Sequence, residues 1–304
     1  MADAFTIAAI PQGSTHRHWK MIQAGALKSV HDLEAAGTQV ELFWKGPIRE
    51  GDQEEHKQIV ESFVRKGVHG LMLVPFDDRF LVRTIEDAAR KGIPTVVVDS
   101  ELNTTQIVNF VATDNKKAGA LAADRMGELL HGKGTVFLQR YQKGSASTEA
   151  REAGFADRIA RAFPSMQVIL SSEFAGATRD TAKRAAEIFL SKQMESVLGV
   201  FTPNESSTTG MLMALQGAHG PHKLSFVGFD YSDTLGAGLQ GKQIQGLIVQ
   251  DPFRMGELGV KTLVDYLQGK SVSRRIDTGA TLVTPENAAS AAIRRLLSPP
   301  VLAA

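Results

Sequence analysis

The sequence of 304 residues contains no cysteine. This absence excludes disulfides, thiolate nucleophiles and zinc–thiolate sites together. It is compatible with an exported bacterial protein and equally with a cytosolic one, so the lack of cysteine does not by itself decide the compartment.

Long apolar runs and an excess of one charge are also missing. No apolar stretch approaches the roughly 20 residues that cross a membrane. The 34 Lys and Arg residues and the 33 Asp and Glu residues are interspersed, so we expect no nucleic-acid partner. The N-terminus "MADAFTIAAIP" lacks the basic start and long apolar core of a signal peptide. We therefore expect either a cytosolic protein or a mature form with an added start methionine.

Short apolar runs alternate with amphipathic segments along the whole chain. Such runs, rich in Val and Ile and spaced by helical patterns, indicate βαβ units and parallel sheets. About ten runs are present, and a chain of this length exceeds what one core usually serves, so two sheets fit better than one. The predicted fold class is α/β with two lobes. Clear examples are "TIAAIP" (6–11), "VELFW" (40–44), "PTVVVD" (94–99) and "LSFVGFD" (224–230).

Polar and aromatic side chains follow the predicted strands at their carboxyl ends, where open parallel sheets bind ligands. They combine carboxylates, a guanidinium, amides, imidazoles and flat apolar rings. A sugar needs this mixture, because its hydroxyls both donate and accept hydrogen bonds and its C–H faces lie against aromatic rings. The candidate ligand-binding residues are His16, His18, Trp19, Asp99, Arg151, Asn204, Phe229, Asp230 and Gln250.

Each candidate near the N-terminus has a simpler interpretation. The stretch "QGSTHRHWK" (12–20) could be an ordinary loop that lines nothing. As a metal site it lacks an evident third ligand, so we expect no metal and no cofactor.

The later candidates also have structural alternatives. Asp99, Asp230 and Asn204 could cap helices at strand ends, and capping can coexist with ligand binding. Arg151 could be a solvated helix charge. Phe229 could belong partly to the core, and Gln250 could serve the geometry of a chain crossover.

Several longer stretches, in order and spacing, resemble the sugar-binding proteins of bacterial ABC transporters of the ribose/galactose-binding type. They include "KGVHGLMLVP", "GIPTVVVDS", "STEAREAGF", "FTPNESSTTGMLMAL" and "VQDPFRMGELGVKTLVDYLQGK". The resemblance covers nearly the whole chain. It implies a type I periplasmic binding protein fold, with two Rossmann-like lobes that are joined by three hinge crossovers and close on a monosaccharide or polyol in the cleft.

The resemblance also implies where the lobes and ligand contacts lie. The N-terminal lobe would comprise residues 1–113 and 251–280, and the C-terminal lobe residues 114–250 and 281–304. Three positions depart from ribose binders, which leaves the identity of the sugar open. His18 replaces a phenylalanine, Ser100 stands in place of an arginine, and Ala177 stands in place of an aromatic residue.

By the same resemblance, the expected partners are a sugar or polyol and the permease subunits of an ABC transporter. We expect a monomer that is periplasmic or lipid-anchored and carries no catalytic residue. Three alternatives stay open: the effector domain of a transcription regulator, a binding protein that serves a chemoreceptor or sensor kinase, and an enzyme that uses His16 or His18 as a base.

Overall fold

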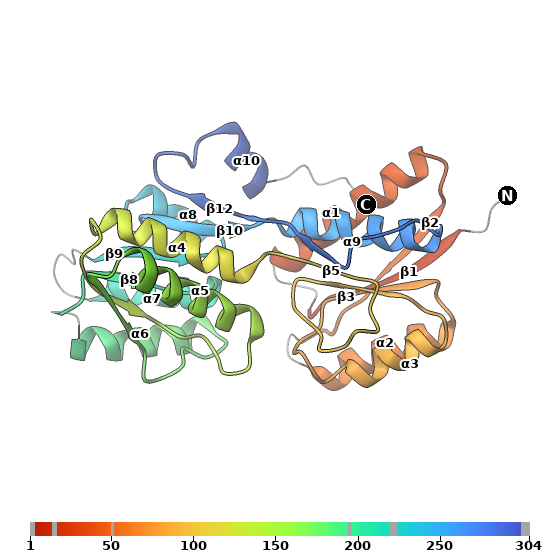
Figure 1. The fold of residues 1–304 in the computed structure, drawn as a ribbon, viewed down its shortest axis with the longest axis horizontal. Helices are drawn as coiled ribbons and strands as arrows, with labels where there is room; N and C mark the ends of the chain where they lie inside the picture. Colours follow the sequence, from red (N-terminus) through yellow and green to blue (C-terminus); the bar gives the residue numbers. More distant parts are fainter. Residues whose placement is uncertain (1–3, 14–16, 50–51, 194–195, 219–223, 299–304) are drawn as a thin grey trace. The chain divides into compact units, whose positions relative to one another are not determined.

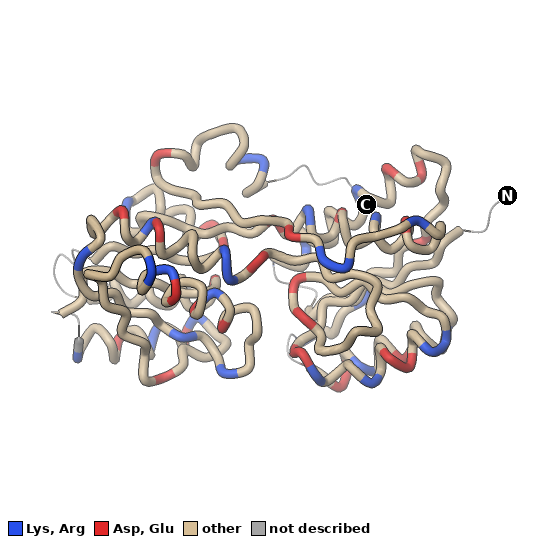
Figure 2. The backbone as a smooth tube through the Cα atoms, in the orientation of Figure 1, with Lys and Arg blue, Asp and Glu red and all other residues tan. Residues whose placement is uncertain are grey.

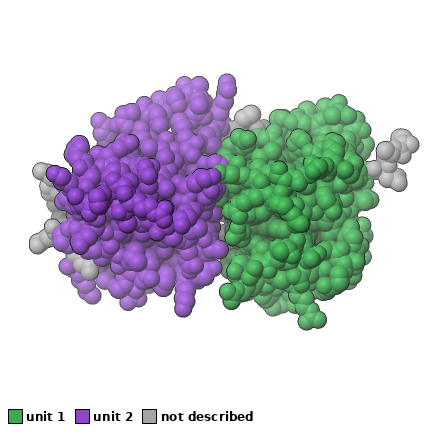
Figure 3. Space-filling view, viewed as in Figure 1, with its two compact units in different colours: residues 1–113, 251–278, 299–304 green, residues 114–250, 279–298 purple. Residues whose placement is uncertain are grey.

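The computed structural model describes residues 4–13, 17–49, 52–193, 196–218 and 224–298, drawn as a ribbon in Figure 1. Acidic and basic residues are interspersed along the chain (Figure 2). The chain forms two compact units (Figure 3). Unit 1 comprises residues 1–113 and 251–278, and unit 2 comprises residues 114–250 and 279–298.

Unit 1 is built on a six-stranded sheet of order β11-β5-β4-β3-β1-β2. All of its strand pairings are parallel. The strands are β1 (Phe5–Ile10), β2 (Val40–Trp44), β3 (Gly70–Leu73), β4 (Thr95–Val98), β5 (Asn109–Ala112) and β11 (Arg275–Asp277). The helices are α1 (Arg17–Ala35), α2 (Gln53–Lys66), α3 (Val82–Arg90) and α9 (Pro252–Leu267).

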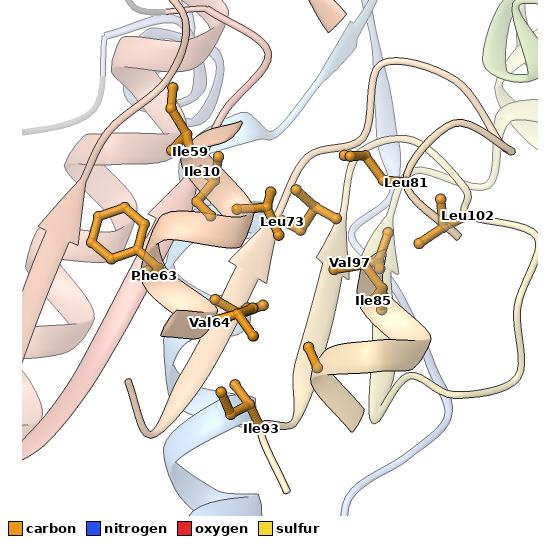
Figure 4. Packing of buried hydrophobic residues seen from close by; sticks show 14 of the residues in the cluster. Ile10, Ile59, Phe63, Val64, Leu73, Leu81, Ile85, Ile93, Val97 and Leu102 are labelled. Carbon is orange, nitrogen blue, oxygen red and sulfur yellow. The ribbon is translucent and has the colours of Figure 1, made fainter. Parts of the chain in front are cut away.

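Helices cover both faces of this sheet, because successive side chains of a strand point to opposite faces. Ile7 and Ala9 pack into a cluster with residues of α1 and α9. Ala8 and Ile10 belong to a second cluster with residues of α2 and α3. Figure 4 shows this second cluster, with Phe63 of α2 among the side chains that cover the sheet. The near-continuous apolar runs of the sequence follow from burial on both faces.

Unit 2 repeats the architecture with a six-stranded sheet of order β12-β10-β9-β8-β6-β7. The pairing of β10 with β12 is antiparallel, and the others are parallel. The strands are β6 (Gly134–Leu138), β7 (Met166–Leu170), β8 (Gly199–Phe201), β9 (Ser225–Phe229), β10 (Gly246–Gln250) and β12 (Ala280–Val283). The helices are α4 (Asn115–Leu129), α5 (Ala146–Ala162), α6 (Arg179–Gln193), α7 (Glu205–Gly217), α8 (Asp233–Gln240) and α10 (Ala291–Leu297).

The two sheets confirm the predicted α/β fold class with two parallel-sheet lobes. The described residues contain two strands beyond the sequence-based estimate, β11 and β12. These strands are only three and four residues long, "RID" and "ATLV", and neither forms a continuous apolar run. The apolar-run criterion could not find them for that reason.

Among the described residues of each unit, two helices approach to backbone contact at a place where both helices carry a glycine. In unit 2, a Cβ atom at Gly154 of α5 would overlap the carbonyl oxygen of Lys116, and one at Gly119 of α4 would overlap that of Arg151. In unit 1, Gly25 of α1 and Gly256 of α9 make the equivalent close approach. The glycines therefore set the spacing of the helices, and Gly119 sets the position of Arg151.

We predict that Gly154→Ala destabilises the protein by about 1–3 kcal/mol, because α4 and α5 must separate to admit the methyl group. Urea unfolding of the full chain measures the change. Gly217→Ala is the matched control, since Gly217 is the last residue of α7 and a Cβ atom there would have no neighbouring atom within 4 Å. Equal stability of the two variants would contradict the prediction.

Candidate functional site

Asp99 lies directly after β4 and adopts a left-handed backbone conformation, with φ of 68°. Its N–H donates to the carbonyl oxygen of Val111 in β5 at 2.9 Å, which extends the strand pairing by one residue. Both carboxylate oxygens are held. Oδ1 lies 2.9 Å from Nε2 of His18, and Oδ2 accepts a hydrogen bond from Oγ of Ser100 at 3.2 Å.

His18 and Trp19 lie in the first turn of α1, which begins at Arg17, so the alternative of an ordinary loop does not hold for these two residues. The His18 side chain is 18% exposed, so it remains accessible beside Asp99. Trp19 is buried in the unit 1 core and packs its ring edge-on against that of His18, with centroids 4.9 Å apart. Trp19 therefore packs against the His18 ring from the core of unit 1. His16 lies outside the described residues.

Gln12, which sequence reasoning did not select, joins this group. Its Nε2 donates to the carbonyl oxygen of Pro75 at 2.6 Å and lies 3.5 Å from Oγ of Ser100. The carboxyl edge of unit 1 thus carries a chain of polar contacts from Gln12 through Ser100 and Asp99 to His18. Gln12 follows β1 after only one proline, so the rule that selected residues after strands could have found it.

Asp230 holds the corresponding place in unit 2, directly after β9. It too is left-handed, with φ of 65°, and its N–H donates to the carbonyl oxygen of Ile248 in β10 at 2.8 Å. Its Oδ1 accepts a hydrogen bond from Nε2 of Gln250 at 2.8 Å, and its Oδ2 accepts one from the N–H of Glu205 at 3.2 Å. Asp99 and Asp230 correspond to each other because β4 and β9 occupy the same place in the strand orders of the two sheets.

Arg151 is buried, with 4% exposure, and is not a solvated helix charge. Its Nε donates to Oδ1 of Asn115 at 2.8 Å, and its Nη1 donates to the carbonyl oxygen of Pro203 at 3.0 Å. The guanidinium lies 3.9 Å above the ring of Phe229, which is fully buried. The guanidinium of Arg151 therefore stacks on the buried ring of Phe229, and the two side chains form a cation–π pair.

Of the three residues that could cap the helix after their strand, only Asn204 does so. Asn204 caps α7, since its Oδ1 accepts hydrogen bonds from the N–H of Ser207 at 3.2 Å and from its hydroxyl at 2.5 Å. Asp230 does not cap α8, whose N-cap is Ser232. Asp99 is followed by β5 and starts no helix. The two aspartates are thus placed by their strands.

Further chemistry-bearing residues lie beyond the carboxyl ends of β6 and β7. Arg140 donates to the carbonyl oxygens of Ser171 and Ser172, and its guanidinium lies 4.4 Å over the ring of Phe174. Phe174 is 39% exposed. Both follow apolar runs as the selected residues do, so the same sequence rule could have found them.

Glu152 lies beside Arg151 in α5, and burial raises its pKa to about 7. The N–H of Tyr141, which donates to Oε1 at 3.0 Å, and the charge of Arg140 oppose this rise. In unit 1, burial lowers the pKa of His56 in α2 to about 4. Neither group was selected from the sequence, because nothing in its neighbours signals burial.

We predict that Glu152→Gln removes a pH dependence of stability. Because the pKa of Glu152 is raised in the folded protein, the stability that protonated Glu152 contributes is fully present below pH 4.5 and is lost as pH rises through about 7. The variant should match the wild type at pH 4.5 and be more stable at pH 8 by about 1–2 kcal/mol, a value reduced for the partial exposure of Glu152 to solvent. Urea unfolding at both pH values measures this. A difference between the proteins that does not change with pH would contradict it.

The described residues offer neither a cluster of metal ligands nor a helix that could span a membrane. Within those residues, no three His, Cys, Asp or Glu side chains are grouped so that they could hold a metal ion. No helix of the described part is long and apolar enough to cross a membrane.

Comparison with known proteins gives a consistent result. Residues 7–271 match the family model of the periplasmic binding protein domain. A xylitol-binding protein of Mycolicibacterium smegmatis is 27% identical over 268 residues, which is 84% of this chain and 75% of that protein. The ribose import binding protein RbsB of Bacillus subtilis is 25% identical over 236 residues, covering 77% of this chain and 75% of that protein.

Among solved structures, a carbohydrate transporter solute-binding protein from Agrobacterium radiobacter, in complex with D-arabinose, superposes with a TM-score of 0.87. It is 28% identical, and the match covers 98% of this chain and 100% of that one.

Proposed function

Because the chain belongs to the periplasmic binding protein domain family, we propose that it is the solute-binding protein of an ABC transporter. It captures a monosaccharide or a related polyol. The observation that carries this proposal is the repeated aspartate. Each unit presents a carboxylate after the third strand in its sheet order, and other groups of the same unit hold both oxygens in place.

The chemistry of the two sets suits hydroxyl groups. A carboxylate oxygen has more than one acceptor site, so an oxygen held by one donor can still accept a hydrogen bond from a sugar hydroxyl. Such charge-assisted bonds are stronger than bonds between neutral groups. Arg151 and His18 add donors for hydroxyl oxygens. The similarity to xylitol-, ribose- and D-arabinose-binding proteins supports the same class of ligand.

We propose His18 and Asp99 of unit 1 and Arg151, Asn204 and Asp230 of unit 2 as direct contacts. Gln250 acts through Asp230, Trp19 supports His18, and Phe229 supports Arg151. His16 stays a prediction from the sequence. That both sets bind one sugar molecule, with the units closing on it, also stays a prediction.

The remaining proposals follow from the family. Its named relatives are binding and import proteins, so we propose that this chain binds its ligand without converting it. We further propose that it acts in the periplasm and delivers the ligand to permease subunits of its transporter.

A thermal-shift panel tests the function. We predict that at least one of D-ribose, D-arabinose, D-allose, D-fucose and xylitol raises the melting temperature of the full chain. Ligand at 100 times its Kd stabilises a folded protein by about 2.7 kcal/mol, which gives a readily measured shift. Bovine serum albumin with the same sugars controls for general effects of polyols. If no sugar or polyol raises the melting temperature beyond this control, the proposed function is wrong.

A further inference from the structure

An ion pair joins the first residues of two helices at the carboxyl edge of unit 2. Arg179, the first residue of α6, donates from Nη2 to Oε1 of Glu205 at 2.7 Å and from Nε to Oε2 at 3.3 Å. Glu205 is the first residue of α7. The two parallel contacts form a bidentate pair, which fixes orientation as well as distance.

Glu205 is connected directly to the proposed ligand-binding group Asp230. Its main-chain N–H donates to Oδ2 of Asp230 at 3.2 Å, while its side chain is held by Arg179. The hydroxyl of Thr209, one turn further along α7, donates to Oε1 of Glu205 at 2.9 Å. The carboxylate of Glu205 therefore anchors the residue whose N–H orients Asp230.

The position of Arg179 is itself set by the core of unit 2. Gln139, fully buried after β6, donates from Nε2 to the carbonyl oxygen of Ala182 in α6 at 3.0 Å. Gly210 of α7 lets the two helices approach closely, since a Cβ there would lie 2.6 Å from that of Ala182. Burial and close packing thus bring the first turns of α6 and α7 together, although Arg179 and Glu205 are 26 residues apart in sequence.

Only the Glu205 member of this ion pair is buried. The side chain of Glu205 is 10% exposed and that of Arg179 is 48% exposed. Removal of the cationic partner leaves the buried carboxylate of Glu205 with an uncompensated charge, which favours its movement toward water. Such a movement would draw the first N–H of α7 away from Asp230.

We infer that Arg179 and Glu205 are positioning residues for ligand binding, which hold the N-terminus of α7 against Asp230 and so fix the direction of its carboxylate. The part of this inference that concerns affinity for sugar rests on the proposed function. The linkage between Arg179 and the N–H of Glu205 can be measured without any ligand.

The first test is calorimetric titration of the full chain with a sugar that stabilises the wild type. Arg179→Met should raise the Kd by about tenfold or more, the effect of losing one hydrogen bond to a charged group. Lys183→Met is the matched control on the same helix, because it removes a cation whose partner Glu187 is exposed. Its Kd should stay within about twofold of the wild type. Equal affinities of the two variants would overturn the inference.

The same titration in the Asp230→Asn variant distinguishes a positioning role of Arg179 from a general loss of structure. If Arg179 acts through Asp230, then adding Arg179→Met to Asp230→Asn should change the Kd by less than about twofold, because coupled residues are not additive. The same loss of affinity in both backgrounds would overturn the inference. Should Arg179→Met not fold, Glu205→Gln replaces it, since this change keeps the acceptor for Thr209 and weakens only the ion pair.

Hydrogen exchange distinguishes failure of the inference from failure of the proposed function. In the absence of ligand, Arg179→Met should speed exchange of the Glu205 amide by about tenfold or more relative to Lys183→Met. A wild type that binds no sugar would disprove the proposed function and leave this measurement to decide the positioning role. Equal exchange in the two variants would overturn the inference.

Discussion

The left-handed conformation of two aspartates is the constraint on which both candidate ligand-binding sets depend. A non-glycine residue with positive φ is uncommon, and aspartate is among the few that tolerate it. At Asp99 and Asp230 the backbone remains bonded to the neighbouring strand while the chain turns away. The carboxylate is thereby fixed to the rigid edge of a sheet. A side chain on a mobile loop would have to be ordered when ligand binds, at a cost in entropy.

The rest of each unit supports these two positions in different ways. In unit 1, a histidine from the first turn of α1 and a serine next in the chain hold Asp99. In unit 2, a buried amide from β10 and the N-terminus of α7 hold Asp230. The N-terminus of a helix carries partial positive charge and favours a carboxylate. The two aspartates therefore share one backbone geometry, but an imidazole holds the carboxylate of Asp99 and a helix N-terminus holds that of Asp230.

The sequence predicted the layered fold well because strands that are buried on both faces must be apolar. It missed β11 and β12, whose polar or short sequences carry no such signal. It selected Asp99 and Asp230 because they directly follow apolar runs, and both lie directly after strands, while their contact with ligand stays a prediction. It could not predict that Trp19 is buried, since its exposure depends on which helix packs against it, whereas it had already offered burial of Phe229 in the core as an alternative. The pairing of Arg179 with Glu205 was also out of reach, because it arises from the close packing of α6 on α7 at Gly210.

The most direct test of these aspartates compares stability with sugar affinity in Asp99→Asn and Asp230→Asn. Asparagine keeps the shape and tolerates positive φ, so the free energy of unfolding should stay within about 1 kcal/mol of the wild type. We expect the Kd measured by calorimetry to rise by about 10-fold or more in each variant, because a charged acceptor is lost. Unchanged affinity in either variant, or a loss of affinity that only follows a loss of stability, would contradict the role assigned to that aspartate.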